Sequence, residues 1–387
     1  MAAGIIASRA APSLTGSGKT NTFQTSVPNA ILIDAQSDSV LFEKNADQPV
    51  EPASLAKLMT LEYVFHELKQ GRLKLDDQFT ISENAWRKGG APSHGSTMFA
   101  AIHSQIDLAD LIQGIIVDSA NDACIAIAEK LAGGEAAFGQ MLTERAREIG
   151  LAHSTFTNST GYTDPGLRVT VHDLAELSRY IIQAYPQYYS YFAQRDFTWN
   201  KIHQENRNPL LGMGLGADGL KTGDTPEAGY GLAGSAVQDD VRLIVVLTGA
   251  KSEKERAEEA RKMLDWGFHN FQSRILFKAG QSIGSAKVFN GSEGYVPLVA
   301  AGPVRVMVPR DGDAELSARI DYTGPIPAPI SKGQAIGTLK VWRGDDLALE
   351  LPLKAARDVG TGSMSQRAMD GAAELMIGLF RAGISRL

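Results

Sequence analysis

The chain has 387 residues, of which 43% are hydrophobic and 21% charged, and its formal net charge is −6. This length exceeds one ordinary hydrophobic core and predicts two domains with appendages. The net negative charge gives no overall attraction to nucleic acid, and without a run of about 18 apolar residues no ordinary membrane-spanning helix is expected. Cys124 is the only cysteine, so an intrachain disulfide is excluded.

The sequence predicts that residues 1–25 form a flexible N-terminal segment. The first eleven residues contain only a short apolar run with no leading positive charge, so a shortened signal peptide and plain disorder both stay open. Gly16–Thr20 suggests a phosphate-binding loop, but Ser13 stands where the first glycine of that motif belongs and no strand precedes it. We therefore expect no nucleotide site here.

The pattern over 26–272 predicts one α+β unit. Ala30–Asp34 and Ser39–Phe42, joined by a polar turn, favour a β-hairpin. Apolar residues recur at helical spacing over 58–68, 108–117, 123–131 and 174–185. Strand character returns over 219–222, 229–233 and 242–248, and an amphipathic helix follows over 254–266. A helical block between strands, closed by a helix, is typical of an α+β fold.

The sequence pattern over 273–360 differs from that of the preceding residues. Short alternating runs separated by Gly, Pro and Asp occur at 304–308, 316–320, 336–341 and 347–351. Several short strands at this spacing predict a small all-β sandwich or barrel. A Gly/Ser linker then leads into a final amphipathic helix within 361–387.

A hydroxyl and an amine stand together in Ser54-Leu-Ala-Lys57, just before an apolar helical segment. The three-residue spacing places both side chains on one face near the start of a helix. Serine is a weak nucleophile that needs a neighbouring base, and a lysine serves if burial lowers its pKa. Taken alone, the motif also fits an exposed helix start.

A second polar pair, Ser119-Ala-Asn121, follows an apolar helical segment. Its hydroxyl and amide have the chemistry to transfer a proton and to hold a substrate amide, although a polar turn between helices explains them as well. The competing Ser82-Glu-Asn84 is better explained by Ser82 capping a helix that runs to Lys88.

The third motif, Lys221-Thr-Gly223, lies on a predicted strand that begins near Asp218. Strand alternation directs Lys221 to one face, where its ammonium can hold a carboxylate, and Gly223 allows a substrate backbone to approach closely. The backbone N–H groups that follow can face a developing oxyanion.

In this order the three motifs resemble the signature set of the penicillin-recognising serine enzymes. The resemblance is specifically to low-molecular-mass D-alanyl-D-alanine carboxypeptidases, and it extends to 95–99, 121–124, 218–230, 264–268 and the β-rich segment with its helical tail. It covers nearly everything from about residue 26 and implies a penicillin-binding domain over 26–272, a β-rich domain over 273–360 and an anchoring helix over 361–387.

The resemblance also implies a role for each motif residue. Ser54 would attack the carbonyl between two D-alanines of a peptidoglycan pentapeptide, and Lys57 would take its proton. Ser119 and Asn121 would relay a proton to the leaving amine and position the substrate. Lys221 and Thr222 would recognise the terminal carboxylate with help from Arg256, and Gly223 would let the substrate backbone approach. The oxyanion hole would be the backbone N–H groups of Ser54 and Asp224.

Asp224 departs from the family, which often carries His or Thr after this glycine, and its carboxylate is expected to disfavour an anionic substrate. The resemblance further implies acylation by β-lactam antibiotics, export to the periplasmic side of the bacterial inner membrane, and no metal or cofactor. A β-lactamase-like hydrolase and a non-catalytic penicillin-binding scaffold are the alternatives.

Two other motifs do not change this interpretation. Gly280-Gln-Ser282-Ile-Gly284 matches a nucleophile elbow, but no histidine follows it, since His269 is the last one. Cys124 sits within an apolar helical segment, which predicts a packed core thiol rather than a nucleophile.

We predict that the tail from Met364 to Leu387 attaches the protein to a membrane surface. One helical face would carry apolar side chains, namely Met364, Ala368, Met369, Ala372, Leu375, Met376, Leu379, Phe380 and Leu387. Deleting 364–387 should move the protein from the membrane to the soluble fraction with carboxypeptidase activity intact. A truncated protein that still sediments with liposomes, or that unfolds, would show that the tail is not the membrane anchor. The alternative is a helix docked on its own protein.

Overall fold

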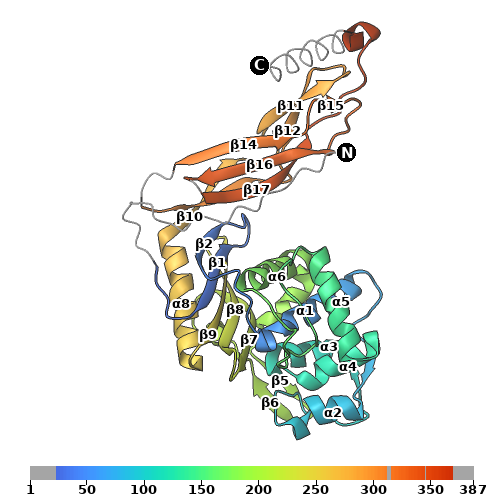
Figure 1. Cartoon of the computed structure of the whole chain (residues 1–387), viewed down its shortest axis with the longest axis vertical. Coiled ribbons are helices and arrows are strands. Elements are labelled where there is room, and N and C mark those ends of the chain that lie inside the picture. Colours follow the sequence, from blue (N-terminus) through green and yellow to red (C-terminus); the bar gives the residue numbers. More distant parts are fainter. Residues whose placement is uncertain (1–22, 312–314, 345, 369–387) are drawn as a thin grey trace.

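The computed structural model describes residues 23–311, 315–344 and 346–368. The predicted N-terminal segment therefore lies almost wholly outside the described residues, as does the predicted tail helix beyond residue 368. Figure 1 shows an α+β body followed by a β-rich part that extends away from the end of α8 (Glu253–Asn270). The predicted α+β class with a β-rich C-terminal domain is confirmed.

A five-stranded antiparallel sheet forms the centre of the body, in the order β2-β1-β9-β8-β7. Its strands are β1 (Asn29–Asp34), β2 (Val40–Lys44), β7 (Ala217–Thr225), β8 (Gly229–Gln238) and β9 (Val241–Ala250). Because β7 lies at one end of this order, one of its backbone edges is not paired within the sheet.

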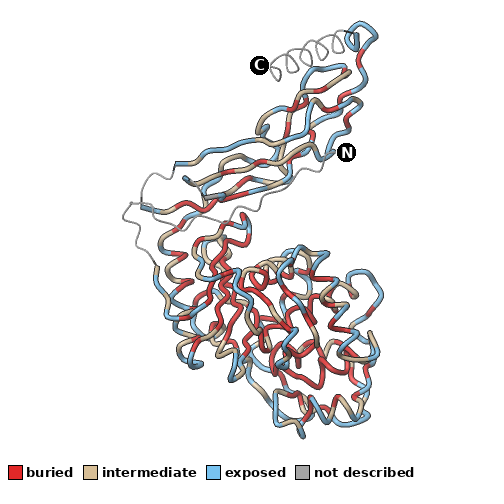
Figure 2. The backbone as a smooth tube through the Cα atoms, in the orientation of Figure 1, coloured by how far each residue is buried: buried red, intermediate tan, exposed pale blue. Residues whose placement is uncertain are grey.

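Both faces of this sheet are covered, as the alternation of buried side chains requires. Ile31 and Val246 belong to the core cluster on the side of the helical block, whereas Leu32 and Val245 belong to a second cluster beneath α8 (Glu253–Asn270). Figure 2 shows buried residues concentrated in the sheet and in the elements packed on it.

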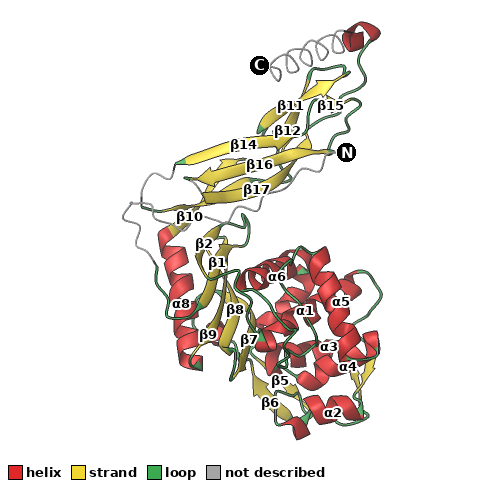
Figure 3. Ribbon diagram, viewed as in Figure 1, coloured by secondary structure: helices red, strands yellow, loops and turns green. Residues whose placement is uncertain are grey.

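The helical block lies between β2 and β7 in the chain and covers one face of the sheet (Figure 3). Its helices are α1 (Lys57–Lys69), α2 (Glu83–Gly89), α3 (Leu108–Gln113), α4 (Asn121–Ala132), α5 (Glu135–Glu148), α6 (Val171–Ala184) and α7 (Pro186–Tyr189). Two small two-stranded antiparallel sheets accompany them, made by β3 (Gln78–Thr80) with β4 (Gln105–Asp107) and by β5 (Asp196–Trp199) with β6 (Ile202–Glu205).

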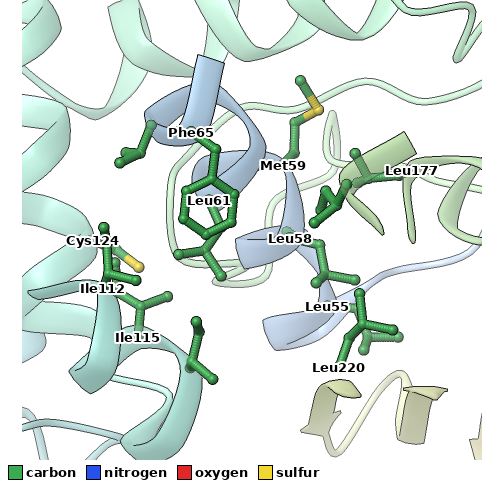
Figure 4. Close-up of a cluster of buried hydrophobic side chains, with 14 of the residues drawn as sticks. Leu55, Leu58, Met59, Leu61, Phe65, Ile112, Ile115, Cys124, Leu177 and Leu220 are labelled. Atoms are coloured by element: carbon green, nitrogen blue, oxygen red, sulfur yellow. The ribbon is translucent and has the colours of Figure 1, made fainter. Parts of the chain in front are cut away.

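Helix α1 runs through the middle of this block. Figure 4 shows Leu61 and Phe65 of α1 on the side of Ile112, Ile115 and Cys124, whereas Leu58 lies near Leu55 and Leu220. All of these side chains are fully buried, so α1 has apolar neighbours on most sides. The helix that begins at Lys57 is therefore fixed in position by packing rather than by its own propensity.

The β-rich part contains two sheets. Strands β10 (Phe271–Phe277) and β13 (Val304–Pro309) pair with each other, and a six-stranded sheet has the order β14-β16-β17-β12-β11-β15. The bounds of its strands are β11 Gly284–Phe289, β12 Tyr295–Val299, β14 Leu316–Tyr322, β15 Ile326–Pro327, β16 Ala335–Arg343 and β17 Asp346–Ala355. The β-rich part has a separate hydrophobic core, which includes Val296, Leu298, Val341 and Leu353.

The β-rich part contacts the body through the β1–β2 hairpin. The Ser39 hydroxyl donates to the backbone carbonyl of Ala348, and Met307 packs in the cluster beneath α8. The last residue of α8, Asn270, accepts a hydrogen bond of 2.8 Å from the backbone N–H of Arg310. The Ser39–Ala348 bond joins the first third of the chain to its last third, and the Asn270–Arg310 bond joins the end of α8 to the β-rich part.

Two details differ from the sequence-based expectations. The single helix expected over 108–117 is instead α3 followed by a π-helix over Gly114–Asp118, which ends where Ser119 turns to a positive φ of 58°. Helix α5 was not predicted, because only a few of its residues are apolar and buried. The predicted N-cap of α2 is present, since Ser82 Oγ accepts from Ala85 N at 2.9 Å.

A buried ion pair between α1 and α5 provides a test of this packing. Glu62 is fully buried and accepts from Arg145 at 2.9 Å and from the Tyr185 hydroxyl at 2.8 Å. Glu62→Ala leaves a buried guanidinium largely uncompensated and should lower the free energy of unfolding by about 3–5 kcal/mol.

The matched control is Glu148→Ala, because Glu148 binds the same arginine at 3.0 Å with a side chain that is 65% exposed. This exposed pair should contribute less than about 1 kcal/mol in urea denaturation. Equal losses from the two variants would contradict the importance of the buried pair.

Candidate active site

Ser54 lies in a short 3-10 helix, Ala53–Ala56, that leads directly into α1. Ala53 has a positive φ of 48°, and Leu55 N donates to Pro52 O at 3.1 Å, so the chain turns tightly just around the serine. A left-handed alanine is costly and persists only where its surroundings hold it. The turn leaves Ser54 half-buried while its neighbours Ala53 and Leu55 are fully buried.

The amine of Lys57 is in contact with this serine. Lys57 is fully buried, and its Nζ lies 2.8 Å from Ser54 Oγ and donates to Thr160 O at 2.5 Å. Burial is the main cause that lowers the pKa of Lys57 to about 8, and the positive charge of Arg207 lowers it further. A pKa of about 8 leaves roughly a tenth of this amine neutral at pH 7 and half of it neutral at pH 8.

Thr160 belongs to a turn, residues 158–162, that our motif analysis did not identify. Gly161 in this turn has a φ of 83°, and a Cβ there would lie 1.9 Å from Ala53 O, so only glycine fits. Asn158 and Gly161 are visible in the sequence as turn residues. The functional contact is made by a backbone carbonyl, however, and no side-chain pattern indicates it.

Ser119 and its neighbour Asp118 are buried with unsatisfied polar atoms. Within the part of the chain that the structure describes, Ser119 Oγ and both carboxylate oxygens of Asp118 have no hydrogen-bond partner. Burial raises the pKa of Asp118 to about 7. Buried polar groups normally find partners, so an unpaired hydroxyl here indicates a group held ready for a ligand or water.

Asn121 begins α4, and its position is set by both backbone and side chain. Its N–H donates to Ser96 O at 2.9 Å, and its Nδ2 donates to the Tyr162 hydroxyl at 3.0 Å. The next residue, Asp122, is fully buried and accepts from Thr97 Oγ1 at 2.6 Å. These bonds tie the 95–99 segment to the start of α4.

Strand β7 brings the third motif against the Ser54 turn. A Cβ on Gly223 would lie 2.8 Å from the backbone nitrogens of both Ser54 and Leu55, so a side chain here would push the strand away. Lys221, which is 2% exposed, donates to Thr222 O at 3.2 Å. Burial first, and then the charge of Lys57, lower the pKa of Lys221 well below its usual range.

Arg256 and Asp224 complete the set of predicted residues, and they differ in burial. Arg256 is 4% exposed, its guanidinium lies 5.7 Å from the Tyr230 ring, and its Nε has no hydrogen-bond partner among the described residues. Burial lowers the pKa of Arg256, and the Asp224 carboxylate opposes that shift. Asp224 itself is exposed. Asp224 therefore borders solvent and affects Arg256 only through its negative charge.

A hollow of about 470 Å³ lies at the end of β7 and is lined by residues 224–230 and 249–251. It adjoins Asp224 and Tyr230, but Ser54 is not among its lining residues, so the nucleophile lies beside this hollow and not within it.

The described residues hold no group of three or more His, Cys, Asp or Glu side chains suited to a metal ion. Over the same described ranges, no helix is long and apolar enough to cross a membrane. Cys124 is fully buried, and burial raises the pKa of its thiol to about 12, which fits a core residue.

Comparisons with known proteins agree with this geometry. The family model described as D-alanyl-D-alanine carboxypeptidase matches residues 17–252, and the model of the C-terminal domain of penicillin-binding protein 5 matches residues 271–361. D-alanyl-D-alanine carboxypeptidase DacC of Escherichia coli is 38% identical over 343 residues, which are 88% of this chain and 86% of that protein. DacA of Haemophilus influenzae is 35% identical, covering 92% and 91% respectively.

Solved structures of penicillin-binding proteins are also similar to this chain. Penicillin-binding protein 5 from Haemophilus influenzae superposes with a TM-score of 0.78 at 35% identity, covering 89% of this chain and all of that one. Penicillin-binding protein D2 from Listeria monocytogenes, in its ampicillin-bound form, has a TM-score of 0.55 at 28% identity and covers 64% of this chain. The chain belongs to the D-alanyl-D-alanine carboxypeptidase family.

Proposed function

We propose that this chain is a serine-type carboxypeptidase that removes the terminal D-alanine from peptidoglycan pentapeptide stems through an acyl-enzyme on Ser54. The observation that carries the proposal is the 2.8 Å contact between the buried Lys57 amine and Ser54 Oγ. A neutral amine at this distance is the base that a serine nucleophile needs.

In the first step neutral Lys57 takes the proton of Ser54, and Oγ attacks the carbonyl between the two D-alanines. The new C–O bond converts the carbonyl into a tetrahedral oxyanion. Backbone N–H groups of Ser54 and Asp224 are suited to hold it, since Gly223 allows β7 to lie against the Ser54 turn. Collapse then breaks the C–N bond.

The leaving amine must gain a proton as that bond breaks. Ser119 is our candidate for the last donor in a relay from Lys57, because its Oγ is buried and lacks a partner among the described residues. Asn121 would hold the amide of the preceding residue of the substrate. Water then hydrolyses the ester and restores Ser54.

The substrate's terminal carboxylate would be bound by Lys221, Thr222 and Arg256, with Gly223 giving the backbone room to approach. The unpaired Nε of buried Arg256 supports this assignment. Edge strand β7 also offers backbone groups to an extended peptide. The exposed Asp224 carboxylate would weaken the attraction for an anion.

The same serine should react with β-lactams, whose carbonyl takes the place of the D-alanyl-D-alanine carbonyl. The relative with bound ampicillin supports this expectation. A β-lactamase-like hydrolase would release the acyl group rapidly, and a non-catalytic scaffold would release no D-alanine. The lifetime of the acyl-enzyme and the release of D-alanine therefore separate the three functions.

The family resemblance supports a proposal for the location of the protein and the roles of its domains. We place the catalytic domain at 26–272, a β-sandwich at 273–360 and a membrane-surface helix at 361–387, on the periplasmic side of the inner membrane. Neither a cofactor nor nucleic acid has a part in this function.

D-alanine release from a pentapeptide by the full chain tests the proposal. Ser54→Ala should abolish both D-alanine release and labelling by a fluorescent penicillin, because Ser54 Oγ forms the ester in this mechanism. Ser282→Ala is the matched control, since Ser282 is exposed on a loop of the β-rich part, and both activities should persist. Mass spectrometry that finds the penicillin adduct away from Ser54, or a wild-type chain that releases no D-alanine, would overturn the assignment.

A further inference from the structure

The carboxylate of Asp218 accepts three hydrogen bonds at the start of β7. The two terminal nitrogens of the Arg242 guanidinium donate to its two oxygens, each at 2.7 Å, and the Tyr189 hydroxyl donates to Oδ1 at 2.8 Å. Arg242 also donates to Ser235 Oγ at 2.7 Å. Arg242 lies on β9, Ser235 on β8 and Tyr189 at the end of α7. These four residues, the Asp218 cluster, therefore join β7 to the next two strands of the sheet and to the helical block.

The contact between Asp218 and Arg242 has the geometry of a strong ion pair. A guanidinium that donates to both oxygens of a carboxylate fixes the orientation of the pair as well as its length. The side chains of Arg242 and Asp218 are 22% and 30% exposed, so solvent screens their attraction only in part. Burial, and then the charge of Asp218, raise the pKa of Tyr189, so its hydroxyl stays protonated and remains a donor.

A β-bulge directs Asp218 to the same face of the sheet as Lys221. Alternation along a regular strand would place these residues on opposite faces, because they are three positions apart. The pairing of β7 with β8 skips Asp218, which is the extra residue of a bulge, and a bulge redirects a side chain. Lys221 pairs with Ala233, which belongs to the core cluster on the side of the helical block. Tyr189 belongs to that cluster too, so Asp218, which it contacts, lies on the same side.

Lys221 depends on β7 for its position. Among the described residues its amine makes no ion pair, and its printed contact is a bond of 3.2 Å to Thr222 O on the same strand. Strand β7 is the edge of the central sheet and pairs with β8 alone (Figure 1). Its far end is held separately, because Gly223 lies against the backbone of the Ser54 turn. The Asp218 cluster therefore supplies a second attachment for the end of β7 that carries Lys221.

We propose that the Asp218 cluster positions the Lys221 amine for the terminal carboxylate of the substrate, and that Asp218 and Arg242 are positioning residues of the reaction. The cluster acts on the recognition of a carboxylate rather than on the attack by Ser54, because the contact of Gly223 fixes the part of β7 beside the serine. This inference rests on the proposed function, in which Lys221 binds that carboxylate.

The test compares benzylpenicillin with its methyl ester, which keeps the β-lactam ring and masks the carboxylate. Asp218→Asn keeps the size of the side chain, but an amide nitrogen cannot accept from Arg242. Acylation by benzylpenicillin should fall about tenfold, since hydrogen bonds to a charged group are the stronger ones, and acylation by the ester should change less than about twofold. The readout is the ratio of the two rates, because a general loss of folded enzyme lowers both equally.

Tyr189→Phe is a second variant, which removes one bond to Asp218 and leaves the ion pair in place. The ratio of acid to ester rates should fall about threefold, since one hydrogen bond is lost. If Asp218→Asn does not fold, this variant decides the question. The matched control is Asp321→Asn, because Asp321 pairs with Arg319 at 2.7 Å in the β-rich part, and its ratio should equal that of the wild type.

A double-mutant cycle shows whether the cluster acts through Lys221. In a Lys221→Ala background, Asp218→Asn should cause no further fall in the ratio of acid to ester rates. The inference is overturned by a ratio that stays at the wild-type value in Asp218→Asn and Tyr189→Phe, by equal losses with acid and ester, or by an undiminished fall in the Lys221→Ala background. Failure of the proposed function looks different, because the wild-type chain would then release no D-alanine or would react equally with acid and ester.

Discussion

The site depends on one constraint, the complete burial of the Lys57 amine against Ser54. Burying a charged ammonium costs free energy. Burial therefore favours the neutral amine and lowers the pKa of Lys57 to about 8. The same shift makes a usable base. Thr160 O and Ser54 Oγ hold the amine at 2.5 and 2.8 Å, so its direction is fixed as well as its charge.

The rest of the body can be understood as support for that contact. Helix α1 is fixed by packing, and its buried Glu62 joins it to α5. Two glycines then bring backbone close to the Ser54 turn from separate elements, Gly161 from the 158–162 turn and Gly223 from β7. The central sheet joins β7 to β1 through β8 and β9, and so carries the third motif to the first.

The sequence was informative where a side chain carries the chemistry. The three-residue spacing predicted that Ser54 and Lys57 lie together. The alternation of residues predicted the strand that carries Lys221. Thr160 could not be found, because it contributes a backbone carbonyl from about 100 residues away, and folding alone brings it to Lys57. Tyr162 resembles any exposed aromatic until its hydrogen bond with Asn121 is seen. The π-helix before Ser119 has the same apolar pattern as an ordinary helix, so periodicity does not distinguish them.

The most direct test of this account is the pH dependence of Ser54 acylation by penicillin. If neutral Lys57 is the base, the rate should rise about tenfold per pH unit from about pH 6 and level off above its pKa of about 8. Asp118, with a pKa of about 7, is the other group that titrates in this range. In an Asp118→Asn variant the pH profile should keep this break, the point near pH 8 where the rate levels off. A rate that is flat between about pH 6 and 8, or a break that disappears with Asp118→Asn, would show that Lys57 is not the base.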